Sequence, residues 1–330
     1  MRVLAGDIGG TKTLLQIADC ETGACRGVRE QRFDSGLHDD LSSILREFLK
    51  QERKQTIEAV CLGVAGPIKE TAAGQSVKVT NLPWSIHSQD LKREFGFPRV
   101  RLINDFQAVG YGIEALGAED LVVLQPGEPA ERGPRAVIGA GTGLGQGMLI
   151  WNRDHYEPVA TEGGHANFAP VNELQIELTR YLLKTAGRTS WELVLSGHGL
   201  AQLYDFLKAR AGTPESPAVA KAVQADDPAA AITQAALERN DPLANQALDL
   251  FVDIYGAQAG NLALTAGATG GVYIAGGIAP KIISRLTDGR FMQAFLNKGR
   301  MKPYVAAIPV QVVMNPNVGL MGAVQVASRL

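Results

Sequence analysis

The sequence predicts an α/β fold with two lobes, and three observations carry this prediction. Strand-like apolar runs alternate with helical patterns along the chain, as in folds built on parallel or mixed sheets. With 330 residues, 45% of them hydrophobic and 20% charged, the chain can bury a large core as two domains. Two glycine-rich segments of the same plan lie in separate halves of the chain, and they indicate a duplicated architecture with a cleft between the lobes.

The individual elements follow from the hydrophobic pattern. The expected strands cover residues 2–7, 13–19, 59–67, 99–105, 136–141, 147–151 and 271–277. Helical spacing of apolar residues extends over residues 41–50, 88–95, 106–116, 172–184 and 244–265. Residues 211–241 are rich in Ala, Pro and Asp and predict a helical hairpin with exposed turns, which is a poor place for chemistry.

Charge and hydropathy exclude several classes of partner. A net charge of -2 and a pI near 6.2 give no basic field that could hold a nucleic acid. The first apolar run reaches Asp7 too early for the core of a secretory signal, so we expect a cytoplasmic protein. The uncharged stretch 255–280 is long enough to span a bilayer, but its Asn and Gly residues predict a buried helix, a turn and a buried strand.

The three cysteines, Cys20, Cys25 and Cys61, lack His or further Cys at zinc-finger spacing. We therefore expect neither a disulfide framework nor a metal site from them. Cys61 lies in the apolar run "AVCLGVAGP" and is expected to be a small core residue.

The two glycine-rich segments are the strongest local signal. "VLAGDIGGTKTLLQIAD" and "AVIGAGTGLGQGMLIW" each place an apolar strand, a turn with Gly and Thr, and a second apolar strand in series. Glycines allow close approach of a ligand to the backbone, and successive N–H groups of such a turn can bind an anion, so phosphate binding is expected. The chain has neither GxxxxGK[ST] nor a properly spaced GxGxxG, and an ordinary tight hairpin would use the same glycines for turn geometry alone.

A family resemblance extends this reading. "DIGGT", "GAGTGLG" and "GVYIAGGI" resemble the two phosphate loops and the adenosine loop of the actin-like (ribonuclease H-like) superfamily of sugar kinases and Hsp70 ATPases. With "GVAGPI", "TNLPW", "LINDFQAVGYG", "TEGGHANFAP" and "ELVLSGHGL", in that order over nearly the whole chain, the sequence resembles bacterial glucokinases of the proteobacterial type. The resemblance implies transfer of the γ-phosphoryl group of Mg-ATP to the 6-hydroxyl of D-glucose in glycolysis, and a homodimer.

The nucleotide-binding residues are implied by this resemblance. Asp7 would orient Mg²⁺ through water, and the phosphate and adenosine loops would supply Gly9, Gly10, Thr11, Gly141, Thr142, Gly143, Gly276 and Gly277. Lys12 stands where relatives often carry an amide residue, so it is left out of the expected site.

The catalytic base is expected at Asp105. "RVRLIND" is an apolar strand that ends in Asn104 and Asp105 directly before a helical pattern. Asp105 could therefore be the helix N-cap and have no catalytic role. The carboxyl end of such a strand is also where α/β folds place catalytic groups, and the family places its catalytic base at this Asp. Phosphoryl transfer needs mainly positioning and charge screening, with one carboxylate to accept the hydroxyl proton.

The sugar-binding residues also follow from the resemblance, because a ring of hydroxyls needs several fixed carboxylates and amides. They are Asn81, Asn104, Asp105, Glu162, His165 and Glu192. In isolation, Glu162 and His165 would belong to a polar surface loop and Glu192 to the first turn of a helix.

Two other functional classes share this fold. The related ROK kinases and repressors carry a Cys-rich zinc motif near the sugar-binding His, whereas no Cys follows His165, and no DNA-binding segment is expected before "DIGGT". A catalytically idle sugar or nucleotide sensor on the same fold is the second alternative, and the presence of Asp7 and Asp105 disfavours it. Mannose, glucosamine and fructose remain open as secondary substrates.

The expected lobes are residues 1–115 plus about 308–330, and residues 116–307 with helical insertions. On this division the expected sugar-binding residues come from both lobes, so we expect glucose to draw the lobes together and exclude water from the reacting phosphate.

Overall fold

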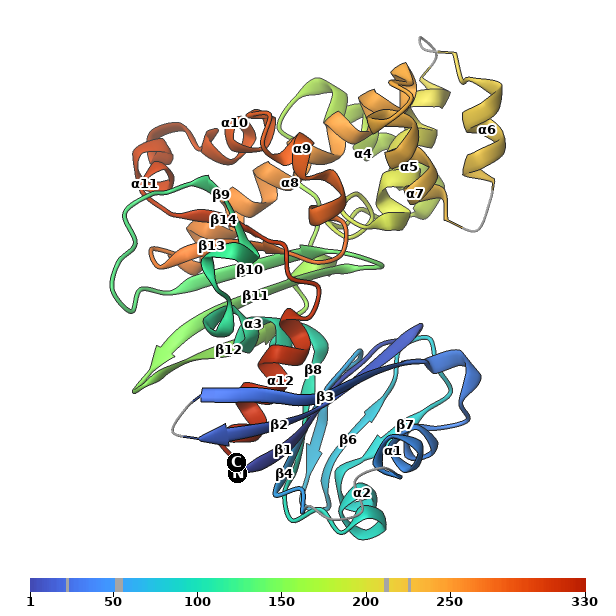
Figure 1. Cartoon of the computed structure of the whole chain (residues 1–330). Helices are drawn as coiled ribbons and strands as arrows, with labels where there is room; N and C mark the ends of the chain where they lie inside the picture. The colour runs from blue at the N-terminus through green and yellow to red at the C-terminus, as the bar shows by residue number, and fades with distance from the viewer. Residues whose placement is uncertain (22–23, 51–55, 211–213, 225–226) are drawn as a thin grey trace. The chain divides into compact units, whose positions relative to one another are not determined.

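The structure is a computed structural model that describes residues 1–21, 24–50, 56–210, 214–224 and 227–330. The chain divides into two compact units. The first comprises Met1–Glu119, Asn152–Ala160 and Asn315–Leu330, and the second comprises Asp120–Trp151 and Thr161–Met314. Each unit contains a main β-sheet (Figure 1).

The main sheet of the first unit has the strand order β3-β2-β1-β4-β8. Strands β1, β2 and β3 pair antiparallel, whereas β4 lies parallel to both β1 and β8. Their bounds are β1 (Arg2–Ile8), β2 (Lys12–Glu21), β3 (Ala24–Asp34), β4 (Ala59–Val64) and β8 (Val100–Asn104). A small antiparallel sheet contains β5 (Lys69–Thr71), β6 (Gly74–Lys78) and β7 (Ser85–His87). The strand β12 (His155–Thr161) also begins in the first unit but is not part of this small sheet.

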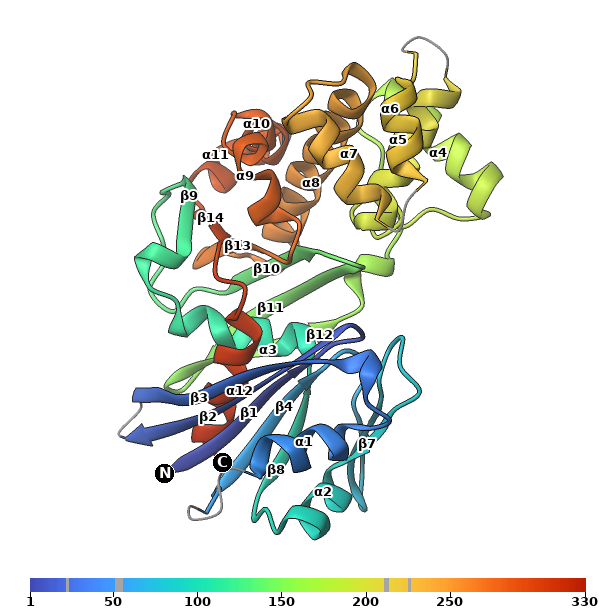
Figure 2. The same cartoon turned by 45° about the vertical axis from the view of Figure 1, so that its right-hand side comes forward.

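Both faces of this main sheet are covered, because the strands are apolar on both sides. Leu4, Leu15 and Leu62 belong to the core beneath α1 (Leu41–Leu49) and α2 (Ser88–Phe95), whereas Val3 and Cys61 belong to a second core. That second core lies against α3 (Asp105–Gly112) and α12 (Val318–Ser328). Figure 2 shows α1 and α12 on opposite sides of the sheet.

Helices α3 and α12 pack unusually closely. A Cβ added to Gly112 would lie 1.9 Å from the carbonyl oxygen of Val318, and one added to Gly322 would lie 1.8 Å from that of Ala108. The missing side chains therefore allow the two backbones to approach, and this contact fixes the helix that begins at Asp105.

The strands of the second unit lie in the order β11-β10-β13-β14-β9 within a six-stranded sheet. These strands are β9 (Leu121–Gln125), β10 (Arg135–Ala140), β11 (Leu144–Asn152), β13 (Gly271–Ala275) and β14 (Val310–Val313). The unit's helices are α4 (Glu173–Ala186), α5 (Gly197–Ala209), α6 (Pro217–Val223), α7 (Pro228–Leu237), α8 (Pro242–Ala266), α9 (Ile283–Leu286), α10 (Arg290–Leu296) and α11 (Lys302–Ala306). Buried α8 forms the centre of the large core that joins the helices to the sheet (Figure 1).

The predicted α/β class is confirmed, and all seven expected strands are present. The expected helix, turn and strand over residues 255–280 are the end of α8, a turn and β13. The expected helical hairpin at 211–241 contains α6 and α7, although residues 211–213 and 225–226 lie outside the described part. None of the described helices is both long and apolar enough to cross a membrane.

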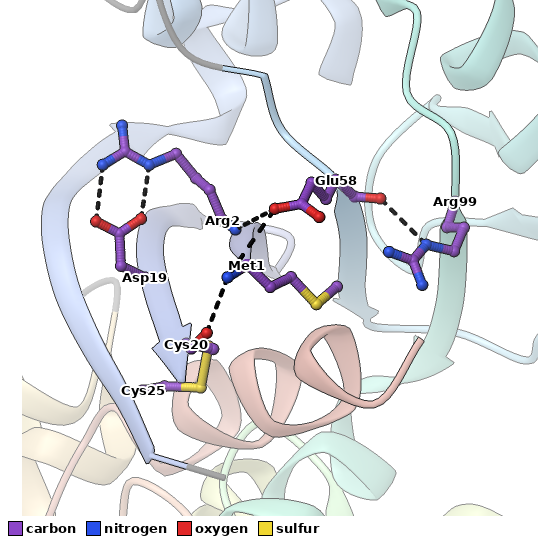
Figure 3. A network of polar contacts seen from close by, with 7 residues as sticks. All are labelled: Met1, Arg2, Asp19, Cys20, Cys25, Glu58 and Arg99. Atoms are coloured by element: carbon purple, nitrogen blue, oxygen red, sulfur yellow. Dashed lines mark hydrogen bonds and ion pairs between the residues drawn. A yellow bond between two sulfur atoms is a disulfide. The ribbon is translucent and has the colours of Figure 1, made fainter. Parts of the chain in front are cut away.

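The expectation of no disulfide is wrong. Cys20 and Cys25 form a disulfide between β2 and β3, where the two residues stand opposite each other in the antiparallel register. The carbonyl oxygen of Cys20 also accepts a 2.9 Å hydrogen bond from the amino group of Met1 (Figure 3). Cys61 is the free cysteine among the described residues, and it is buried as expected.

Candidate active site

The first glycine-rich turn joins β1 to β2. Its first amide is used internally, because Gly9 N donates to Lys12 O at 2.9 Å. The N–H groups of Gly10 and Thr11 have no acceptor among the residues that the structure describes. Two adjacent free amides at an exposed turn form a suitable anion-binding concavity.

The buried residue Ser35 holds this turn through two hydrogen bonds. Ser35 follows β3, and its hydroxyl donates to Gly9 O at 2.9 Å while its N–H donates to Thr11 O at 3.1 Å. The hydroxyl also lies 3.0 Å from that of buried Thr13. Ser35 was missed from the sequence because the strand before it is mostly exposed and gives no apolar pattern.

Asp7 and Asp105 are the two acidic residues of the first unit's candidate site. Asp7 stands near the end of β1, and Asp105 begins α3 directly after β8. Because β1, β4 and β8 are parallel neighbours, the two carboxyl groups come to the same edge of the sheet. Gly63 on β4 allows this approach, since an added Cβ would lie 2.9 Å from Ala108 Cβ on α3.

Both carboxyl groups are shifted toward the neutral form. Burial raises the pKa of Asp7, and the charge of Lys12 partly offsets this effect. Burial, followed by the charge of Asp7, raises the pKa of Asp105 to about 6, although hydrogen bonds such as that from Phe106 N oppose the rise. Lys12, whose role the sequence left open, is thus close enough to Asp7 to act on it electrostatically.

Asp105 is not the helix cap. Asn104 is the N-cap of α3, with its side-chain oxygen accepting from Phe106 N at 2.9 Å and Gln107 N at 3.3 Å. Asn104 N in turn donates to Gln107 Oε1 at 3.2 Å, which completes a capping box. The capping alternative considered for Asp105 is therefore wrong, whereas the side-chain acceptor of Asn104 is already occupied within the helix.

Asn81 lies beside the first turn. It has a left-handed backbone with φ of 64°, which Asn tolerates better than most residues. An added Cβ on Gly10 would be 3.3 Å from Asn81 Cβ, so the exposed Asn81 side chain begins next to the free amides.

The second glycine-rich turn repeats the pattern of the first. Gly141 N donates to Gly143 O at 2.9 Å, and the N–H groups of Thr142 and Gly143 have no acceptor within the described ranges. Gly141 O accepts from Gly197 N at the start of α5. The two turns are more than a hundred residues apart in the sequence, and each presents two adjacent backbone N–H groups.

The glycines after β13 lie against the strand that leads into this second turn. Gly276 has φ of 83°, and an added Cβ would be 2.4 Å from Ala140 O. Ile278 N donates to the same oxygen at 3.2 Å, while Gly277 is exposed with open space around its Cα. The predicted adenosine loop and second phosphate loop are thus neighbours within the second unit.

Three predicted sugar-binding residues meet in the second unit. His165, on the 3-10 turn Gly163–His165, has Nε2 3.9 Å from Glu162 Oε2 and Nδ1 3.7 Å from Glu192 Oε1. Glu162 and His165 are exposed, whereas the Glu192 side chain is 33% exposed. The other three, Asn81, Asn104 and Asp105, belong to the first unit.

Within the described ranges no group of three or more His, Cys, Asp or Glu side chains could hold a metal ion. A cation beside the Asp7 carboxylate would therefore need further ligands from a bound molecule or from water.

Comparison with known proteins agrees with this picture. A family model described as glucokinase matches residues 4–330. The chain is 45% identical to a glucokinase of Nostoc punctiforme over 99% of both chains. The crystal structure of a glucokinase from an Antarctic psychrotroph is 32% identical, with a TM-score of 0.86, and the match covers 100% of this chain and 99% of that one.

A more distant match concerns the fold alone. A ROK family glucokinase from Streptomyces griseus, solved with glucose and AMPPNP, has a TM-score of 0.64 at 19% identity and full coverage of both chains.

The paired glycine-rich turns on an actin-like α/β scaffold define an ATP-dependent sugar kinase, a phosphotransferase with an alcohol group as acceptor. Because the family model and the relatives match nearly the whole chain, the kind of sugar kinase is also clear. The chain belongs to the glucokinase family.

Proposed function

We propose that this kinase transfers the γ-phosphoryl group of Mg-ATP to the 6-hydroxyl of D-glucose, with Asp105 as the general base. Asp105 would accept the proton of the 6-hydroxyl as the sugar oxygen forms a bond to the γ-phosphorus. The bond between that phosphorus and the bridging oxygen breaks, and ADP leaves with the electron pair. The products are glucose 6-phosphate and ADP.

The observation that carries this proposal is the position of the partly buried Asp105 carboxyl, at the sheet edge to which β1 also brings Asp7. The Asp105 pKa of about 6 leaves this carboxyl ionised at neutral pH and a stronger base than an ordinary aspartate. Asn104 carries out the capping of α3, so the acid at the next position is not required for that purpose.

For the nucleotide, the free amides of Gly10, Thr11, Thr142 and Gly143 would hold phosphate oxygens, with Gly9 and Gly141 shaping the turns. Gly276 and Gly277 would face the adenosine. The Streptomyces griseus enzyme, whose fold this chain shares, was solved with an ATP analogue, which supports ATP as donor.

The residues also fit a magnesium ion. Asp7 is a partly buried carboxylate whose side-chain oxygens accept no hydrogen bond from the described residues. A single protein carboxylate is enough for Mg²⁺, because this ion keeps several water ligands and also binds the phosphates of the substrate. Mg²⁺ would neutralise charge on the phosphates there. Asp7 would orient it, through water.

The sugar hydroxyls would exchange hydrogen bonds with five side chains besides Asp105, which are those of Glu162, His165, Glu192, Asn81 and Asn104. The nearly complete match to glucokinases supports glucose over other hexoses. We further propose a homodimer, as the family resemblance implies, and a cytoplasmic location, as the early Asp7 in the first apolar run suggests. Light scattering would measure the oligomeric state.

A coupled assay of ADP formation with ATP and glucose tests the proposal. Asp105→Asn should lower kcat by about 100-fold or more while glucose still binds, because the shape remains and the base is lost. Asp39→Asn, at an exposed acid of the same unit, is the matched control and should keep full activity. Near-normal turnover of Asp105→Asn, or ATP hydrolysis that ignores sugar, would favour the sensor alternative.

A further inference from the structure

The Glu192 carboxylate is shared between two predicted binding regions. Its Oε2 atom accepts a 3.0 Å hydrogen bond from Leu144 N, the residue that follows the turn 141–143. Its Oε1 atom lies 3.7 Å from His165 Nδ1, on the side of the other predicted sugar-binding residues. The Leu144 N–H is thereby satisfied by a side chain rather than left for a phosphate.

The backbone around this carboxylate is packed tightly. Glu192 N donates to Gly164 O at 2.9 Å, in the turn that carries His165. A Cβ on Gly164 would be 2.1 Å from Leu144 O, and a Cβ on Gly143 would be 2.5 Å from Glu192 Oε2. The second phosphate turn, the turn at 163–165 and the segment of Glu192 therefore touch one another directly.

We propose, building on the function above, that Glu192 is a positioning residue that couples glucose binding to nucleotide binding. A glucose hydroxyl that donates to Oε1 would fix the carboxylate. Oε2 would then hold Leu144 N–H and, with it, the amides of Thr142 and Gly143 in the geometry that binds phosphate. By thermodynamic linkage, ATP bound to that turn strengthens glucose binding by the same factor.

A charged acceptor is suited to this task. Hydrogen bonds to an ionised carboxylate are stronger than neutral ones, and the partial burial of Glu192 limits competition from water. The turn itself contains one internal hydrogen bond, from Gly141 N to Gly143 O, so the bond to Glu192 adds a second constraint on its C-terminal side.

The first test changes the phosphate turn and measures the sugar. In Gly143→Ala the new methyl group would displace the Glu192 carboxylate, which is the movable end of a flexible side chain. Calorimetry with glucose alone should show an affinity about ten-fold lower than that of the wild type. Gly197→Ala, at the start of α5 beside the same turn, is the matched control: its Cβ would make only ordinary contacts at 3.6 Å or more, so its glucose affinity should equal that of the wild type.

The second test measures the coupling itself. Glucose affinity is determined with and without a saturating non-hydrolysable ATP analogue, and the ratio is expected at about five-fold or more in the wild type. Glu192→Gln should reduce this ratio to near one. Glu162→Gln should weaken glucose binding but keep the ratio, because Glu162 lies near His165 and, among the described residues, makes no hydrogen bond or ion pair with the phosphate turn.

The outcomes separate this proposal from the proposed function. If Gly143→Ala binds glucose as tightly as Gly197→Ala, or if Glu192→Gln keeps the wild-type ratio, the coupling role is wrong while glucose phosphorylation stands. If both Glu192→Gln and Glu162→Gln bind glucose normally, the sugar-site assignment fails and the coupling role with it.

Discussion

Asp105 titrates in the electrostatic field of Asp7: burial raises its pKa first, the charge of Asp7 adds to the rise, and the pKa reaches about 6. The two acids come from separate stretches of sequence and meet because parallel strands deliver their carboxyl ends to one edge of the sheet. A base with this pKa is ionised at neutral pH and binds a proton readily as the sugar hydroxyl reacts.

The first prediction concerns the pH dependence of catalysis. Because Asp105 must be ionised to accept a proton, kcat/KM should rise with pH, reach half its maximum near pH 6 and level off above it. Initial rates between pH 4.5 and 8.5, with the coupling enzymes in excess, measure this profile. A profile that stays nearly flat down to pH 4.5, as an unperturbed aspartate would give, would contradict the assignment.

The second prediction is the effect of the same carboxyl on stability. The pKa of Asp105 is raised on folding, so the folded state disfavours the ionised form and loses stability as the pH rises from about 4 to about 6. Asp105→Asn should therefore increase the free energy of unfolding at pH 7.5 by about 1 to 3 kcal/mol, after allowance for partial solvent exposure.

Urea unfolding of Asp105→Asn and the wild type at pH 7.5 and pH 4 measures this difference. The gain should shrink strongly at pH 4, where the folded wild-type carboxyl is neutral and about half of the unfolded-state carboxyl groups are protonated as well. Asp39→Asn should show no gain at either pH. A gain that is the same at both values would mean that ionisation of Asp105 is not its cause.

The sequence predicted the central strands because they are apolar throughout, as in the fully buried β4. It did not predict β3, which lies at the edge of its sheet and exposes most of its charged side chains. That omission also concealed the disulfide, because only the β2–β3 register places Cys20 opposite Cys25. Local apolar patterns reveal buried strands, whereas edge strands depend on pairing that the pattern does not record.

The candidate site was predictable where a motif carries it. Motifs identify the glycine-rich turns and the six sugar-side residues, and the roles of these residues stay predictions. The structure adds contacts between distant segments, such as Leu144 with Glu192, which no local pattern contains. The boundary of α3 was wrong by one residue, because Asn and Asp are both good caps and only the hydrogen bonds distinguish Asn104 from Asp105.

The third prediction follows from that boundary. Asn104→Ala removes the acceptor for Phe106 N and Gln107 N and should lower the free energy of unfolding by about 1 kcal/mol. Asn104→Ser keeps a capping oxygen and should lose less. Thermal and urea unfolding of the two variants compare them directly, and equal losses would show that capping is not the main contribution of Asn104.

The fourth prediction concerns the support of the first phosphate turn. Ser35→Ala leaves Gly9 O and the buried Thr13 hydroxyl without their partner, which should cost about 1 to 3 kcal/mol of stability. Because the turn then loses its anchor, KM for ATP should rise more than KM for glucose. Ser43→Ala removes an exposed hydroxyl that bonds Asp40 O and is the matched control, with both KM values unchanged.

The last prediction uses the disulfide between Cys20 and Cys25. Closing so short a loop removes conformational freedom from the unfolded chain, and on the chain-entropy model this stabilises the protein by about 2 kcal/mol. Dithiothreitol should lower the wild-type free energy of unfolding by that amount. Cys25→Ser should be less stable from the start and should not respond to the reductant.

Thiol titration provides an independent measurement of the same bond. The native protein should react slowly, because the free thiol of Cys61 is buried and burial raises its pKa to about 12. The chain holds three cysteines, so unfolding without reductant should expose one thiol and unfolding with reductant should expose three. Three reactive thiols in the unfolded, unreduced protein would show that Cys20 and Cys25 are not bonded in solution, and the effect of dithiothreitol on stability should then be absent as well.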